Sequence, residues 1–111
     1  MPQSNPLARI VLTTAADAEE AGRLAQVLVE ERLAACVTLI PSAQSVYRWK
    51  DKIETASETL LLIKTGEEQL PALEIRLHAL HSYETPEFLV LNVESGSPDY
   101  LAWLAANLLH P

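Results

Sequence analysis

The sequence predicts an α+β sandwich in which an antiparallel sheet packs against helices. Segments typical of strands and helices alternate in the order βαββαβ, with one more helix at the end. The chain is 111 residues long and 49% hydrophobic, and it has no internal repeat or linker. We therefore expect a single domain over residues 1–111, with residues 1–7 as a flexible N-terminal tail.

The chain opens with a strand and a helix. Residues 8–14 are rich in β-branched side chains and predict the first strand. Asp17 followed by Glu20 matches a capping box, in which each residue satisfies a backbone amide of the other. The apolar spacing behind this pair predicts a helix that runs to about Arg32.

A long hairpin is expected next. Residues 33–49 read as one strand, and Pro41 indicates a bend or bulge at Pro41-Ser42, because proline cannot donate to a strand ladder. Lys50-Asp51-Lys52 predicts a tight turn, and residues 53–65 return as the third strand.

The second half of the chain predicts a helix, a strand and a last helix. Gly66 precedes the helix, and Pro71 lies either in its first turn or at a kink. Residues 87–94 predict the fourth strand. Ser97-Pro98-Asp99 is a strong start signal for a helix over residues 98–108. This order of elements is the ferredoxin-like layout.

The predicted strands are apolar on both faces. A sheet that is covered on one face only should alternate apolar and polar residues. Here Val37 and Leu39 lie opposite Cys36 and Ile40, and the third and fourth strands follow the same pattern. Three helices can hardly cover both faces, so we expect a partner subunit and an oligomer. The alternative is that the last helix covers the open face.

Composition excludes several classes of function. With 15 acidic against 8 basic residues the net charge is −7, which disfavours nucleic acid as a partner. No segment predicts a membrane span or a secretory leader, so we expect no membrane association. The single cysteine forms no internal disulfide and suits the cytoplasm. Three widely spaced glycines exclude the usual phosphate-binding loops and the GxSxG nucleophile elbow.

The end of the second helix carries the candidate metal ligands. His78 and His81 are three residues apart and therefore lie on one side of the helix, and Glu84 or Glu87 could complete a site for Cu(II) or zinc. The alternative is that both imidazoles only complement the helix dipole. Cys36 is interpreted as a buried small hydrophobe.

Two further groups of side chains are expected to lie where subunits meet. Tyr47 and Trp49 are expected to pack at a subunit interface. Lys64, Tyr83, Glu84 and Glu87 are candidates for the lining of a cleft between subunits, with structural ion pairs as the preferred alternative.

Eight short segments, in order between Arg9 and Leu104, resemble the CutA family of divalent-cation tolerance proteins. They are Glu31-Arg32-Leu33-Ala34-Ala35-Cys36-Val37, Ile40-Pro41, Tyr47-x-Trp49, Lys52-Ile53-Glu54, Glu58, Ile63-Lys64-Thr65, His81-x-Tyr83-x-x-Pro86-Glu87 and Asp99-Tyr100-Leu101-x-Trp103-Leu104. The resemblance implies a ferredoxin-like subunit assembled as a homotrimer, with the long second and third strands interlocking between neighbours.

The sequence departs from the copper-binding members of that family at two positions. The resemblance implies a cysteine at the end of the first strand and a second histidine just before His81, but Thr13 and Leu80 stand there. Without those ligands we expect modest affinity for Cu(II), with His81 as the main ligand, helped by His78 or Glu84.

Together these inferences predict a non-enzymatic cytoplasmic homotrimer linked to divalent-metal tolerance. No Ser/His/Asp, Cys/His or paired-carboxylate arrangement stands out at a usable spacing. The alternative function is that of a PII-like trimer that responds to a small molecule or a nucleotide.

Overall fold

The computed structural model describes residues 7–110. Its elements in chain order are β1 Ala8–Ala15, α1 Ala18–Glu30, β2 Cys36–Trp49, β3 Lys52–Gly66, the short 3-10 helix η2 Glu67–Gln69, α2 Leu70–Leu80, β4 Leu89–Asn92 and α3 Pro98–Ala106. The expected N-terminal tail, apart from Leu7, lies outside the described residues.

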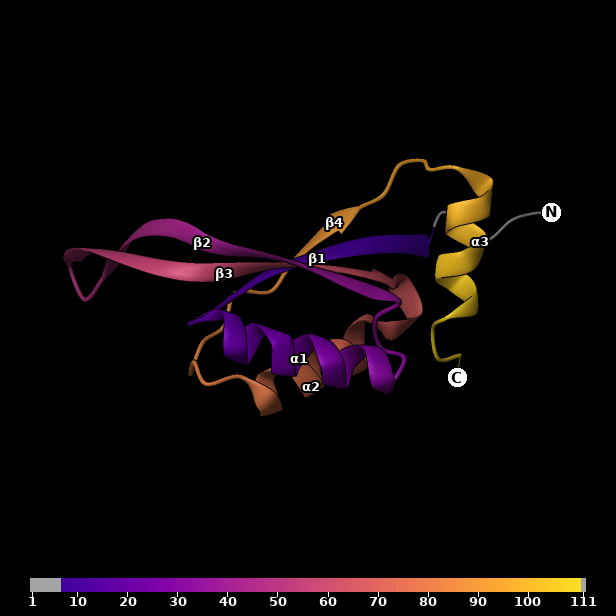
Figure 1. Cartoon of the computed structure of the whole chain (residues 1–111). Coiled ribbons are helices and arrows are strands. Elements are labelled where there is room, and N and C mark those ends of the chain that lie inside the picture. The colour runs from indigo at the N-terminus through magenta and orange to yellow at the C-terminus, as the bar shows by residue number, and fades with distance from the viewer. Residues whose placement is uncertain (1–6, 111) are drawn as a thin grey trace.

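The four strands form one antiparallel sheet in the order β2-β3-β1-β4. Helices α1 and α2 lie side by side on one face of this sheet, and α3 stands at its end (Figure 1). This arrangement confirms the predicted α+β ferredoxin-like sandwich.

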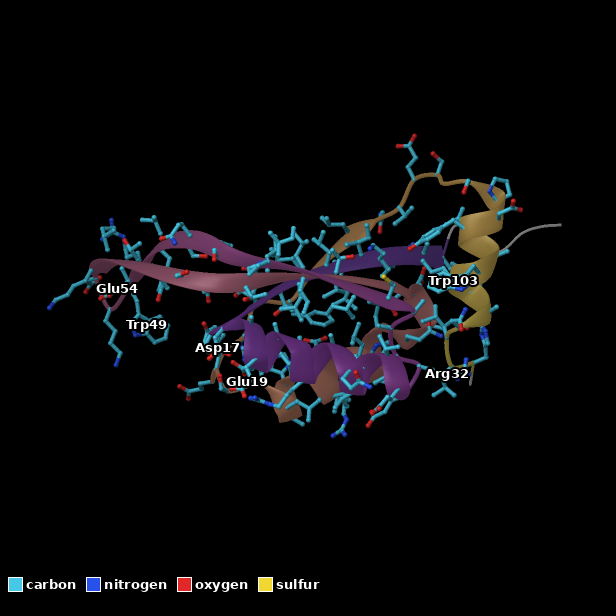
Figure 2. The ribbon with its side chains drawn as sticks, in the orientation of Figure 1. Asp17, Glu19, Arg32, Trp49, Glu54 and Trp103 are labelled. Atoms are coloured by element: carbon cyan, nitrogen blue, oxygen red, sulfur yellow. The ribbon has the colours of Figure 1, made fainter. Side chains whose placement is uncertain are left out.

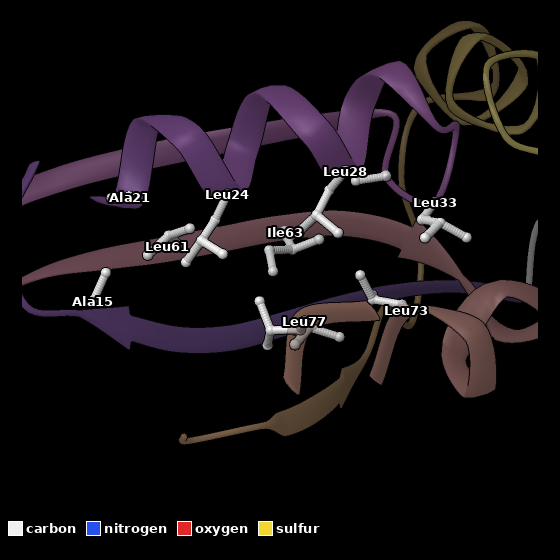
Figure 3. Close-up of a cluster of buried hydrophobic side chains, with 11 residues drawn as sticks. Ala15, Ala21, Leu24, Leu28, Leu33, Leu61, Ile63, Leu73 and Leu77 are labelled. Atoms are coloured by element: carbon white, nitrogen blue, oxygen red, sulfur yellow. The ribbon is translucent and has the colours of Figure 1, made fainter. Parts of the chain in front are cut away.

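The hydrophobic core fills the space between the two helices and the sheet (Figure 3). Its fully enclosed members include Val11 from β1, Leu28 from α1, Ile63 from β3, and Leu73 and Leu77 from α2. Strands β1 and β3 contribute buried side chains to this core from one face only, and Val37 and Leu39 of β2 pack against them as partly buried residues.

Helix α1 begins at the predicted cap, but it ends before the predicted position near Arg32. The Asp17 carboxylate accepts a hydrogen bond of 2.8 Å from the Glu20 amide. The helix ends at Glu30, because Arg32 adopts a left-handed φ of 60° and the amides of Leu33 and Ala34 both donate to the Leu28 carbonyl. The predicted strand start at residue 33 is therefore wrong, and β2 begins at Cys36.

The outer parts of β2 and β3 form an arm that projects beyond the rest of the sheet (Figure 1). The predicted bulge is confirmed, since the register shifts between Ile40 and Ala43 and Ser42 has a φ of 62°. Lys50 and Asp51 close the arm in the expected tight turn, with φ values of 51° and 66°. Positive φ at both central positions is the pattern of a type I′ turn, whose twist matches that of the two strands.

The second half of the chain follows its prediction with shorter elements. Pro71 lies in the first turn of α2, where its missing amide costs nothing. β4 covers only residues 89–92 and α3 ends at Ala106, so both predicted ranges were too long. Leu101 and Leu104 of α3 are buried, whereas Trp103 is 45% exposed.

The sheet face opposite the two helices stays open. Ile40, Leu89 and Leu91 remain 44%, 55% and 46% exposed, so α3 does not cover this face. Instead, Leu104 and Leu108 pack on Ala35 at the end of the sheet. Cys36 lies on the open face and is partly exposed, so its interpretation as a buried residue is wrong for a single subunit.

Within residues 7–110, every helix is too short or too polar to cross a bilayer.

Candidate functional site

A groove of about 650 Å³ lies where the arm meets the loop between α2 and β4. From the sheet it is lined by Thr14, Ser45, Tyr47, Trp49 and Glu58. From the loop it is lined by Tyr83, Glu84 and Glu87. The groove thus combines carboxylates, hydroxyl groups and aromatic rings from segments that are far apart in the sequence.

Glu58 is a buried carboxylate on β3, just beyond the bulge. The Tyr83 hydroxyl donates to its Oε2 atom at 2.6 Å. Burial raises the pKa of Glu58, but hydrogen bonds from the hydroxyls of Tyr83, Ser45 and Thr14, and the nearby His81, outweigh burial and hold the pKa below its ordinary value. The groove therefore has an ionised carboxylate at neutral pH.

Tyr83 links this carboxylate to the histidine beside it. Burial and the hydrogen bond to Glu58 both raise the pKa of Tyr83, so its phenol stays protonated and donates. Its ring lies 4.7 Å from the His81 ring, measured between centroids, with the planes tilted by 45°. The loop that follows α2 is thereby fixed against β3.

His81 has a fully buried side chain, and both of its ring nitrogens are engaged. The Tyr83 amide donates to Nδ1 at 3.0 Å, so Nδ1 is the acceptor. Nε2 then carries the proton and donates to the Thr14 carbonyl at 2.7 Å. In this arrangement His81 has no free lone pair to offer a metal ion.

Glu20 is the second buried carboxylate beside His81. It accepts hydrogen bonds from the amide and the hydroxyl of Ser82 at 2.8 and 2.9 Å, and from the Ala16 amide at 3.3 Å. Burial raises the pKa of Glu20, but these hydrogen bonds and the nearby His81 outweigh burial and lower it overall. Where the predicted capping box would have Glu20 accept from the Asp17 amide, Glu20 accepts from the Ala16 amide and from Ser82, and it ties α1 to the loop after α2.

The predicted metal ligands are not assembled into a centre. His78 is exposed in the last turn of α2, where its Nδ1 lies 2.9 Å from the Glu74 carbonyl, and Glu84 is exposed at the rim of the groove. In the described part of the chain, no three His, Cys, Asp or Glu side chains come close enough together to hold a metal ion. The residues present therefore do not form a ready-made copper site.

The other predicted site residues separate into two places. Tyr83, Glu84 and Glu87 do line one groove. Lys64 lies elsewhere, on the open face, where its Nζ atom is 2.7 Å from Thr38 Oγ1 and 3.7 Å from Cys36 Sγ. The structural ion pairs preferred for Glu84 and Glu87 do not occur within residues 7–110.

Sequence reasoning missed the roles of Glu20 and Glu58. A signal for Glu20 was present, since it stands four and eight residues before Leu24 and Leu28 and thus on the buried stripe of its helix. An acid on an apolar stripe needs buried partners. For Glu58 no such signal exists, because its partners come from three other segments of the chain.

Comparisons with known proteins agree on one family. The family model described as CutA1 divalent ion tolerance protein matches residues 9–107. A relative named divalent-cation tolerance protein CutA, from Pectobacterium atrosepticum, is 50% identical over 99 residues, which are 89% of this chain and 90% of that relative.

Solved structures agree with the same family. The crystal structure of CutA1 from Oryza sativa is similar with a TM-score of 0.93 at 38% identity, covering 97% of this chain and 100% of that one. The structure of the periplasmic divalent cation tolerance protein CutA from Archaeoglobus fulgidus has a TM-score of 0.88 at 35% identity, covering 91% and 98%.

Proposed function

Since the chain belongs to the CutA1 divalent ion tolerance family, we propose that it acts in divalent-cation tolerance as a non-enzymatic homotrimer that binds Cu(II) or another divalent ion weakly. The match over residues 9–107 carries this proposal, because it spans every strand and helix but the first residue of β1. The alternative of a PII-like signalling trimer is not favoured, since the family model and the relatives described above are CutA proteins.

The open face of the sheet supports the homotrimer. It presents Ile40, Leu89 and Leu91 to solvent, and within residues 7–110 no strand pairs with the outer side of β4. Exposed apolar faces and unpaired edge strands are costly in a single subunit. A closed ring of identical subunits covers both on every copy.

The metal proposal concerns His78, His81 and Glu84. His78 supports a first contact, because its Nδ1 faces the Glu74 carbonyl and its Nε2 has no partner within residues 7–110. Glu84 follows in the exposed loop. His81 would join only after it gave up a hydrogen bond to Thr14 or Tyr83, a requirement that weakens binding.

Calorimetric titration with Cu(II) at pH 7.5 and pH 5.5 tests this site. We expect weak binding that decreases further below about pH 6, because the ion competes with protons for imidazoles whose unperturbed pKa is about 6.5. His78→Ala should remove most of the binding, and His81→Ala should change it less.

The third histidine of the chain gives a matched control. His110 is exposed near the C-terminal end, so His110→Ala should bind Cu(II) like the unchanged protein. Tight binding that survives both His78→Ala and His81→Ala would place the ion elsewhere. Absence of binding to the unchanged protein would refute the metal part of the proposal.

The arrangement around His81 supports a protein that is not an enzyme. The Ser82 hydroxyl donates to the Glu20 carboxylate and not to an imidazole, and both nitrogens of His81 are engaged. Neither nitrogen of His81 is therefore available to act as a general base for the Ser82 hydroxyl. We expect no turnover of phosphate esters, acyl phosphates or peptides, and hydrolysis that disappears in His81→Ala or Cys36→Ala would contradict this.

We also propose a cytoplasmic location. The lone cysteine, which forms no internal disulfide, is compatible with a reducing compartment. Cell fractionation tests this proposal, and recovery in the periplasmic fraction would overturn it.

A further inference from the structure

The groove between the arm and the loop carries carboxylates that form no ion pair with any cation within residues 7–110. It is lined by Glu58, Glu84 and Glu87, and no Lys, Arg or His within residues 7–110 lines it. None of the ion pairs formed by these described residues involves the three glutamates. A cationic occupant would therefore meet uncompensated carboxylates.

Aromatic rings form the walls of the same groove. Tyr47 and Trp49 are two residues apart on β2, so both side chains point to one side of the strand, and Tyr83 lines the groove from the loop. The faces of such rings attract cations. The ring of Trp49 already has the ammonium group of Lys50 at 5.9 Å from its centroid.

The size of the groove and the spread of its carboxylates select the kind of cation. Its volume of about 650 Å³ is in the range typical of small-molecule sites. A bare metal ion needs several ligands within a few ångströms, and the described residues contain no such group of acids. Carboxylates distributed around aromatic walls suit a bulky charge instead.

We propose that this groove binds a small organic cation that bears a quaternary ammonium or protonated amino group. The cationic group lies between the rings of Tyr47 and Tyr83 and is neutralised by Glu58, with Glu84 and Glu87 at the rim. The hydroxyls of Ser45 and Thr14, which already donate to Glu58, keep that carboxylate ionised and aimed at the groove. This binding differs from the proposed metal site, which relies on His78, and the two sites share only Glu84.

Choline and its neutral isostere 3,3-dimethylbutan-1-ol provide the probe pair. Calorimetry measures the binding of each compound to the assembled protein. In a second measurement, on the variant Trp103→Phe, the fluorescence emission of Trp49 is recorded during the same titration. The two tryptophans lie at opposite ends of the molecule, so the background substitution leaves the groove unchanged (Figure 2). We expect choline to bind and the neutral isostere to bind at least about tenfold more weakly, since a cation–π contact and an ion pair are lost.

Variants of the groove locate the site. Tyr47→Leu and Glu58→Gln should each weaken choline binding at least about fivefold, whereas Glu94→Gln, at an exposed position outside the groove, should leave it unchanged. Because Glu58 is buried, the double variant Glu84→Gln/Glu87→Gln provides a second test at exposed positions. Its affinity for choline should also decrease.

Four results would overturn the proposal. They are no binding of choline, equal binding of choline and its neutral isostere, unchanged affinity in the folded groove variants, and complete displacement of choline by an equimolar divalent cation. None of these results bears on the family or on Cu(II) binding at His78, so the two proposals fail separately.

Discussion

Glu20 and Glu58 flank one histidine, and the three residues come from α1, β3 and the end of α2. Each carboxylate is buried, yet each keeps its charge through hydrogen bonds from hydroxyl or amide groups. His81 lies beside both carboxylates, and its Nδ1 accepts a hydrogen bond from the Tyr83 amide. These polar groups connect the loop after α2 to α1, β1 and β3.

The lowered pKa of Glu20 predicts a loss of stability in acid. A carboxylate whose folded pKa lies below its ordinary value of 4.5 stabilises the fold above that value. The stabilisation is lost as the pH falls from about 4.5 through the lower folded pKa. Urea unfolding is measured at pH 7 and at pH 3.5, at one protein concentration. From the higher to the lower pH, the free energy of unfolding should decrease more for the unchanged protein than for Glu20→Gln.

Glu19→Gln is the control for this prediction, because Glu19 is the exposed neighbour of Glu20 on the same helix. At pH 7, Glu20→Gln should itself destabilise the fold by about 1–3 kcal/mol, since it leaves buried donors poorly paired. An equal pH dependence in the two variants would contradict the role given to Glu20.

The candidate site was predictable only in part. Spacing identified His78, His81 and Glu84 as neighbours along the chain, and Lys64, Tyr83, Glu84 and Glu87 were candidates for a cleft between subunits, of which Lys64 lies elsewhere. It could not show that His81 is used up by the Thr14 carbonyl, which lies 67 residues away in sequence. Long-range backbone partners leave no trace in the spacing of side chains.

At the scale of elements, composition, periodicity and start signals located every strand and α-helix but missed the short 3-10 helix η2, and the other errors fell at the ends of elements. α1 stops early because backbone amides of Leu33 and Ala34 return to the Leu28 carbonyl, a contact that no side-chain pattern encodes. β4 is short because only its residues Leu89 to Asn92 pair with β1. The bulge at Pro41-Ser42 was predictable because proline itself interrupts the ladder.

For the whole molecule, the open sheet face leads to a prediction about mass. Light scattering at micromolar concentration should give three times the 12.2 kDa mass of the chain. Leu91→Lys, which places a charge on the open face, should shift the protein toward monomer.

Ile75→Lys is the matched control for assembly. Ile75 is 73% exposed on α2, on the helical side of the sheet, so this variant should keep the trimer mass. A monomer mass for the unchanged protein, or dissociation of both variants alike, would refute assembly through the open face.

The central place of β1 has a consequence for synthesis of the chain. Its hydrogen-bonded neighbours are β3, in which Gly66 lies opposite Ala8, and β4, in which Asn92 lies opposite Arg9. The ribosome makes β1 first and both neighbours much later. The run Ile10-Val11-Leu12 must therefore wait unpaired until β3, which ends at Gly66, has emerged, and unpaired apolar strands are prone to aggregate. Its second edge waits longer still, until β4 at Leu89–Asn92 follows.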